Sequence, residues 1–145
     1  MDKIIDNNCT DKNTVHSYLN TYEKLLEKYK NKKNNILEIG IGSGGSIKLW
    51  NDYFPNSMIY SVDIEDRILC KEIKNMERIK LFIPSNAYDK NFIKSNFRNK
   101  NIIFNIIIDD GPHTLESMIN CIELYLELLS DDGILIIEDV KSLEW

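Results

Sequence analysis

The sequence predicts an α/β fold: a doubly wound, mostly parallel sheet of about five strands with helices on both faces. Short apolar runs alternate with helical stretches from Asn35 onward. Apolar runs such as IIFNIII and ILII are continuous, as in strands that helices cover on both sides. Acidic residues end several of the expected strands, and the carboxyl ends of parallel strands meet at one edge of a sheet.

The composition is that of one ordinary folded domain. The chain has 145 residues, 43% of them hydrophobic and 28% charged, which excludes a disordered chain and a pair of ordinary domains. A formal net charge of −5 argues against binding along a nucleic-acid backbone. No apolar run approaches the ~20 residues of a membrane-spanning helix, and the amino terminus lacks a secretory signal, so we expect a cytoplasmic protein with no membrane partner.

The three cysteines, Cys9, Cys70 and Cys121, lie far apart in the sequence. Their spacing matches neither a zinc-ligand pattern nor a disulfide framework, so we expect three reduced thiols.

Hydrophobic periodicity places the elements. The first dozen residues are polar and expected to be frayed, and a helix is expected over residues 14–30 within an N-terminal segment, 1–34. The α/β core is expected over residues 35–145. Strands are expected at residues 36–41, 58–63, 79–83, 102–109 and 134–138. Helices are expected at residues 46–53, 66–74, 90–97 and 115–129. An apolar stripe on the last helix is expected to face the core: Leu115, Met118, Ile119, Ile122, Leu126 and Leu129.

A glycine-rich turn, LEIGIGSGGS, follows the first expected strand. Gly40, Gly42 and Gly45 satisfy G-x-G-x-x-G between a strand and a helix, which is the context that this fingerprint requires. Asp63 ends the next strand about twenty residues later, where a carboxylate accepts hydrogen bonds from ribose hydroxyls. The turn therefore predicts a cofactor that contains a nucleoside.

Glu38, two residues before the first glycine, bears on which cofactor binds. A carboxylate beside the turn repels the pyrophosphate of a dinucleotide. It suits the sulfonium and ammonium groups of S-adenosylmethionine. A small NAD-binding oxidoreductase remains a less favoured alternative.

LEIGIGSGG resembles the first motif of class I S-adenosylmethionine methyltransferases, whose Rossmann-like sheet usually has seven strands. The matching positions are Glu38, Gly40, Gly42 and Gly44. Asp63 in YSVDI resembles the ribose-binding acid of the family. Asn86 in PSNAYD stands where many members carry an Asp that contacts the adenine.

The stretch IIIDDGPHTLESMINCIELYLELLSDDGILIIEDV resembles the macrocin and mycinamicin type of metal-dependent sugar O-methyltransferases. Their pattern is an Asp-Asp-Gly-x-His turn, a helix, a strand and then Glu-Asp. The resemblance implies Asp110, Glu138 and Asp139 as metal ligands and His113 as the catalytic base. Asp109, which caps the strand or makes a supporting hydrogen bond, is counted with the cofactor-binding residues.

The chemistry of these residue types agrees with that assignment. Three carboxylates without a thiolate form a hard oxygen site, suited to Mg²⁺ or another hard divalent cation. A bound metal lowers the pKa of a coordinated hydroxyl, and a histidine accepts the released proton near neutral pH.

The sequence thus predicts a metal-assisted, S-adenosylmethionine-dependent O-methyltransferase that acts on a sugar hydroxyl or a similar polar small molecule. The chain stops before the last two strands of the usual fold, so the fifth strand is expected at an open edge. A second copy of the chain or the N-terminal segment would cover that edge, or the chain is a fragment. The alternative function is a shortened, non-catalytic module that binds a cofactor or a partner.

Overall fold

A computed structural model of the chain describes residues 1–14 and 17–140. Within these residues, five parallel strands form one sheet in the order β3-β2-β1-β4-β5. The strands are β1 (Asn35–Ile39), β2 (Met58–Val62), β3 (Ile79–Phe82), β4 (Phe104–Asp109) and β5 (Leu129–Ile137). The strand order reverses beside β1, which makes the carboxyl ends of β1 and β4 the expected place for a ligand. The predicted α/β class is confirmed.

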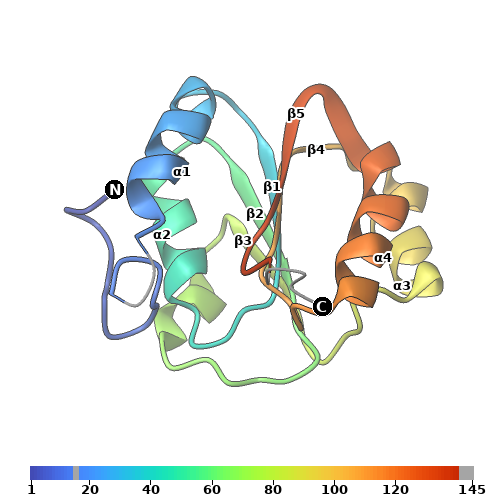
Figure 1. The fold of residues 1–145 in the computed structure, drawn as a ribbon, viewed down its shortest axis with the longest axis horizontal. Coiled ribbons are helices and arrows are strands. Elements are labelled where there is room, and N and C mark those ends of the chain that lie inside the picture. Colours follow the sequence, from blue (N-terminus) through green and yellow to red (C-terminus); the bar gives the residue numbers. More distant parts are fainter. Residues whose placement is uncertain (15–16, 141–145) are drawn as a thin grey trace.

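Helices cover both faces of the sheet (Figure 1). One face carries α1 (Leu19–Leu26) and α2 (Gly45–Tyr53), and the other carries α3 (Lys90–Asn96) and α4 (Leu115–Tyr125). Two cores result, and neighbouring strand residues contribute to them alternately. Ile36 packs in the core under α1 and α2, whereas Leu37 packs in the core under α3 and α4. Both residues are fully buried, which explains why the strands read as continuous apolar runs.

The prediction of an α-helix over residues 66–74 is wrong. The structure has bends there, followed by a short 3-10 helix, η2 (Lys71–Asn75). The backbone amides of Leu69 and Cys70 both donate to the carbonyl oxygen of Ser43, each over 3.0 Å. These amides are therefore unavailable for the i to i−4 bonds of an α-helix, and the segment is held against the glycine-rich turn instead.

The helix predicted over residues 115–129 is also too long. The prediction of which of its faces packs in the core is wrong. After α4, a 3-10 turn (Leu126–Leu128) leads directly into β5 at Leu129. The predicted apolar stripe lies mostly outside the core, because four of its members are 43–56% exposed: Leu115, Ile119, Ile122 and Leu126. A second helical stripe faces the sheet: Ser117, Cys121, Leu124, Tyr125 and Leu128. In this stripe, the Tyr125 hydroxyl donates to the carbonyl oxygen of Ala87 over 2.7 Å. Hydrogen bonding and close packing therefore determine which face of α4 lies against the sheet.

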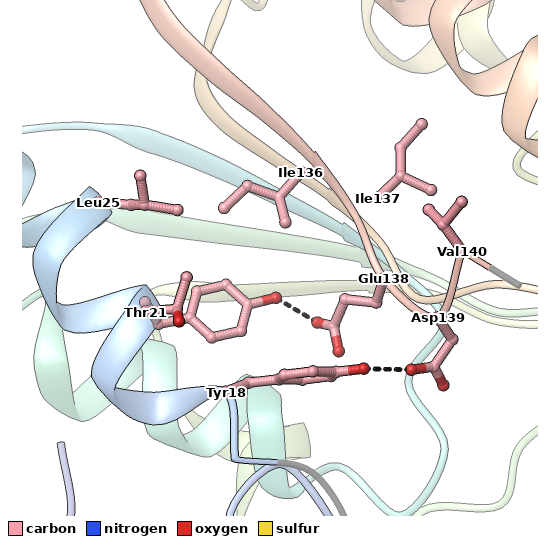
Figure 2. A pocket seen from close by; sticks show the side chains of 9 residues that line it. Tyr18, Thr21, Leu25, Ile136, Ile137, Glu138, Asp139 and Val140 are labelled. Carbon is pink, nitrogen blue, oxygen red and sulfur yellow. Dashed lines mark hydrogen bonds between the residues drawn. The ribbon is translucent and has the colours of Figure 1, made fainter. Parts of the chain in front are cut away.

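The N-terminal helical segment reaches the edge strand β5 through the 3-10 turn Glu27–Tyr29 that follows α1. In this turn, the Tyr29 hydroxyl donates to the carbonyl oxygen of Asp132 over 2.5 Å. A groove of about 330 Å³ remains between α1 and the end of β5, lined mostly by apolar side chains (Figure 2). Across the described residues, β5 pairs with β4 alone. Among the same residues, no helix has the length and apolar character needed to cross a membrane.

The two stripes of α4 and of the 3-10 turn after it predict different responses to matched substitutions. Leu124→Ala should lower the free energy of unfolding by about 2–4 kcal/mol, because Leu124 is 6% exposed and packs in the core. Leu126→Ala should cost less than about 1 kcal/mol, because Leu126 is 56% exposed. Urea unfolding measures both, and equal losses would contradict the described face of α4.

Candidate functional site

The glycine-rich turn after β1 is held by close backbone contacts on two sides. Gly40, Gly42 and Gly44 have positive φ angles of 92°, 49° and 89°. A Cβ at position 40 would lie 2.2 Å from the backbone oxygen of Asp110, so only glycine allows the turn to meet the end of β4. At Gly45 the close neighbour is Cys9, whose carbonyl oxygen accepts the Gly45 amide over 3.1 Å.

Asp63, at the end of β2, closes the turn from the other side. Its Oδ2 accepts the backbone amides of Ile41 and Gly42 over 2.8 and 3.2 Å, and Oδ1 accepts the amide of Glu65 over 3.0 Å. The carbonyl oxygen of Asp63 accepts the amide of Ser85, which places the following residue, Asn86, at the same rim. Asn86 is exposed, and its side-chain oxygen accepts the amide of Tyr88 over 2.9 Å.

The deepest part of the site is a cluster of three carboxylates around one ammonium group. Lys12 Nζ lies 2.5 Å from Glu138 Oε1, 2.8 Å from Asp110 Oδ2 and 3.7 Å from Glu38 Oε1. The Lys12 side chain is 1% exposed. The first dozen residues, expected to be frayed, thus insert a cation into the core of the site. No local pattern marks Lys12, because a single lysine in a polar segment looks like any solvated one.

Lys12 neutralises only part of this cluster. Burial alone would lower the pKa of its ammonium, but the three carboxylates outweigh burial and raise that pKa. Burial raises the pKa of Glu38 to about 8; Lys12 opposes this rise, and the like charges of Asp110 and Glu138 add to it. Burial likewise raises the pKa of Glu138. The carboxylates therefore still favour additional positive charge.

Two further contacts position the buried acids. Trp50 Nε1 donates to Glu38 Oε2 over 2.6 Å, while Glu38 Oε1 is buried without a hydrogen-bond partner. The Tyr22 hydroxyl donates to Glu138 Oε1. Glu38 is fully buried, and the ammonium group that it faces is that of Lys12.

A second, more open group shares Asp110 with the buried cluster. His113 Nε2 lies 3.6 Å from Asp110 Oδ1 and 3.9 Å from Asp139 Oδ2. The Tyr18 hydroxyl donates to Asp139 Oδ1 (Figure 2), and this hydrogen bond raises the pKa of Tyr18 to about 12. His113 and Asp139 adopt positive φ angles of 56° and 51°, which are uncommon outside glycine and aim both side chains toward Asp110.

Asp109 differs from its neighbour Asp110. Its carboxylate accepts the Tyr88 hydroxyl over 2.8 Å and the Gly111 amide over 3.2 Å, and the residue is 3% exposed. Burial raises its pKa. In the structure Asp109 supports the turn that presents Asp110 and His113.

The structure brings the predicted site residues to one rim of the sheet. It distributes the predicted metal ligands, however, between two groups of side chains. Glu138 points inward to Lys12, and Asp139 points outward to His113, with Asp110 between them. Two overlapping sets could hold a cation, Glu38–Asp110–Glu138 and Asp110–His113–Asp139, each with ligand atoms within 4.8 Å of one another.

No family model matches the chain. The chain is 28% identical over 138 residues to mycinamicin VI 2''-O-methyltransferase of Micromonospora griseorubida. It is 27% identical over 139 residues to demethylmacrocin O-methyltransferase of Streptomyces fradiae. Among solved structures, it superposes with a TM-score of 0.78 and 27% identity on the MycE methyltransferase of the mycinamycin biosynthetic pathway, a complex with Mg and SAH.

The chain therefore resembles part of the macrocin and mycinamicin O-methyltransferases in sequence and in fold. The alignments cover 90% and 91% of this chain but only 33% and 34% of those two relatives. The chain therefore spans about a third of the length of the curated relatives it matches. More distant methyltransferases share the fold alone, such as DesVI of Streptomyces venezuelae, with a TM-score of 0.57 and 14% identity.

Lys12 should be essential to the stability of the metal-free chain. Lys12→Met leaves the buried carboxylates without their counter-charge, so it should lower the free energy of unfolding by about 3–5 kcal/mol in a chelating buffer. Lys3, in the same N-terminal segment, is exposed, and Lys3→Met should change stability by less than about 0.5 kcal/mol. Urea unfolding distinguishes the two, and equal stabilities would show that the buried ion pairs contribute nothing.

Proposed function

We propose that this chain is an S-adenosylmethionine-dependent O-methyltransferase assisted by a divalent metal. One observation carries the proposal. The glycine-rich turn and the carboxylate cluster meet directly at the contact between Gly40 and Asp110. A cofactor on the turn and a cation in the cluster would then be immediate neighbours. The MycE complex, which contains Mg and SAH, supports this pairing of ligands.

The turn and its neighbours would hold the cofactor. Asp63 has the charge and the position to accept ribose hydroxyls, and the exposed Asn86 lies at the same rim for contact with the adenine. The carboxylates beneath the turn favour a cationic cofactor and disfavour a pyrophosphate. These charges favour S-adenosylmethionine over NAD.

Asp110, Glu138 and Asp139 would hold the metal. Asp110 belongs to both groups of ligand atoms and Glu138 and Asp139 to one each, so these two would have to converge on one ion. The environment of the three acids fits a hard cation. All three offer carboxylate oxygens, Glu38 Oε1 is a buried oxygen without a hydrogen bond, and Lys12 already stands in the cluster as a cation. Because the Lys12 ammonium contacts both Asp110 and Glu138, it must withdraw or share these oxygens when a metal binds. The metal, when bound, would acidify the acceptor hydroxyl.

His113 would act as the general base. Its Nε2 would take the proton of the acceptor hydroxyl, and the resulting oxyanion would attack the methyl group of the sulfonium. Asp110 and Asp139, both within 4 Å of Nε2, would stabilise the protonated imidazole.

The groove between α1 and β5 would receive the acceptor. Leu25, Ile136 and Val140 give it an apolar wall, and Asp139 lies at one end (Figure 2). An apolar wall beside a carboxylate fits a glycoside, whose ring packs on the wall while a hydroxyl reaches the acids. Relatives that act on sugars, such as L-olivosyl-oleandolide 3-O-methyltransferase of Streptomyces antibioticus, support this class of acceptor.

A second candidate is a methyltransferase-like module that binds the cofactor without transferring a methyl group. It is favoured by the Lys12 ammonium, which already occupies the carboxylate cluster where the proposed metal would bind. Transfer of a radioactive methyl group from S-adenosylmethionine to a deoxysugar glycoside separates the two functions, because only the enzyme labels the glycoside.

Calorimetry should detect binding of S-adenosylhomocysteine and none of NAD. Asp63→Ala should weaken this binding about tenfold or more, because a charge-assisted hydrogen bond contributes about 1.5–3 kcal/mol. Asp66→Ala is the matched control, since Asp66 is exposed and paired with Lys74. Tight binding of NAD without binding of S-adenosylhomocysteine would refute the choice of cofactor.

Mg²⁺ binding should depend on Asp110 and Glu138. Asp110→Asn or Glu138→Gln should abolish the calorimetric signal of Mg²⁺, because each removes a charged oxygen ligand. Asp131→Asn, at an exposed position near the start of β5, should leave the signal unchanged. Unchanged Mg²⁺ affinity in both site variants would remove the metal from the proposed function.

A further inference from the structure

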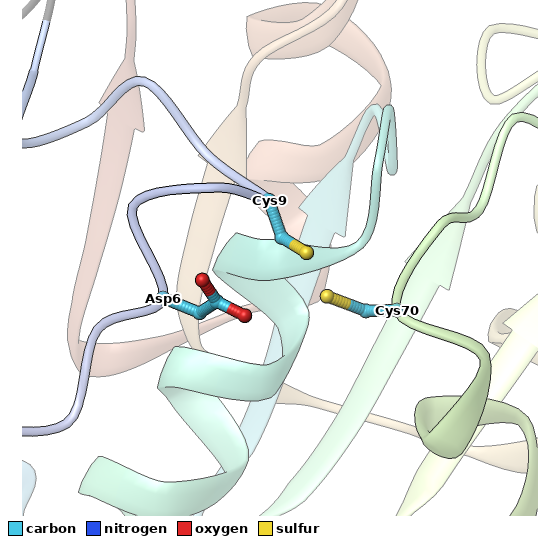
Figure 3. Close-up of side chains that lie close together, drawn as sticks. All are labelled: Asp6, Cys9 and Cys70. Atoms are coloured by element: carbon cyan, nitrogen blue, oxygen red, sulfur yellow. The ribbon is translucent and has the colours of Figure 1, made fainter.

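A second group of metal-binding side chains lies on the opposite flank of the glycine-rich turn. Asp6, Cys9 and Cys70 each offer a ligand atom, and these atoms lie within 4.8 Å of one another. Figure 3 shows the two thiols pointing toward each other, with the carboxylate of Asp6 beside them. Cys70 is buried, whereas Asp6 and Cys9 are partly exposed, so the group has an open side.

Backbone contacts fix both cysteines to the turn. The carbonyl oxygen of Cys9 accepts the amide of Gly45 over 3.1 Å, and the amide of Cys70 donates to the carbonyl oxygen of Ser43 over 3.0 Å. A Cβ at position 45 would lie 2.3 Å from the Cys9 oxygen, so glycine is required there for the approach. The carbonyl oxygen of Asp6 in turn accepts the Cys9 amide over 3.0 Å. The ligands are therefore positioned by the fold before any ion binds.

We propose that Asp6, Cys9 and Cys70 form a binding site for a thiophilic divalent cation of the Zn²⁺ class. Zinc accepts thiolate and carboxylate ligands in a tetrahedral arrangement, and three protein ligands leave its fourth position to water or an external ligand. Two sulfur ligands disfavour Mg²⁺, which prefers oxygen. The two proposed sites would therefore bind different cations: the thiol site favours a thiophilic cation such as Zn²⁺, and the carboxylate site favours a hard cation such as Mg²⁺.

Metal binding at this site must displace thiol protons, because zinc binds cysteine as the thiolate. Burial raises the pKa of Cys70, and the adjacent Cys9 thiol adds to the rise, so a metal binds here in competition with protons. The backbone amide of Asn8 lowers the pKa of Asp6, which keeps its carboxylate ionised.

An ion at this site would tie the N-terminal segment to the glycine-rich turn. Asp6 and Cys9 belong to the same segment that inserts Lys12 among the carboxylates. An ion bound by Cys9 would therefore also restrain Lys12, which lies only a few residues further along the same segment. The inference concerns a site that the methyltransferase proposal does not use, so either can fail without the other.

Co²⁺ titration of the reduced, chelator-treated full chain tests the proposal. Co²⁺ bound by thiolates shows a sulfur-to-metal charge-transfer band in the near ultraviolet, and we expect this band to saturate at one equivalent and to vanish when Zn²⁺ is added. Excess Mg²⁺ should leave the band unchanged. Cys9→Ser and Cys70→Ser should each weaken the band, because its intensity follows the number of thiolate ligands.

Cys121→Ser is the matched control, since Cys121 lies in the other core, and it should retain the full band. Circular dichroism establishes that each variant is folded; Cys9 is only partly buried, so Cys9→Ser keeps the test informative should Cys70→Ser unfold. Co²⁺ binding without a sulfur band would assign the ion to the carboxylates and overturn the proposal. So would a band that survives at full strength in Cys9→Ser, or a Cys9–Cys70 disulfide found by mass spectrometry in place of Co²⁺ binding.

Discussion

The ion pairs of Lys12 are the contact on which the rim of this sheet depends. Three acids from the ends of β1, β4 and β5 converge at one point, and their mutual repulsion would drive them apart without a cation between them. The ammonium of Lys12 supplies part of that charge from a segment far away in the sequence. The cluster is therefore a structural ion pair in which Lys12 is the cation.

The same arrangement explains why the glycine-rich turn sits where it does. Its first glycine touches the backbone of Asp110, its far end touches Cys9, and Asp63 holds the amides between them. Each contact is made by backbone or by a short side chain, so the turn leaves little room for adjustment. A ligand on this turn would meet carboxylates on one flank and thiols on the other.

The site also shows why neighbouring acids with the same chemistry take different roles. Asp109 turns inward to Tyr88, whereas Asp110 faces Lys12 and His113. Glu138 and Asp139 likewise have different charged neighbours: Glu138 contacts Lys12, whereas Asp139 lies near His113. Adjacent acids therefore serve two environments, although each of these two also accepts a tyrosine hydroxyl.

The sequence by itself determined the alternation of strands and helices, the two-sided burial of the sheet, the place of the glycine-rich turn and the gathering of Glu38, Asp63, Asp110 and Glu138 at one rim. These follow from local periodicity and from the rule that parallel strands share a carboxyl edge. Only the tertiary structure decided that Lys12 lies among the acids, that Cys9 meets Cys70, that residues 66–74 avoid an α-helix and that α4 buries Cys121 and Tyr125 instead of Ile119 and Ile122. Each of these depends on contacts between segments distant along the chain, and no local pattern of residue types records them.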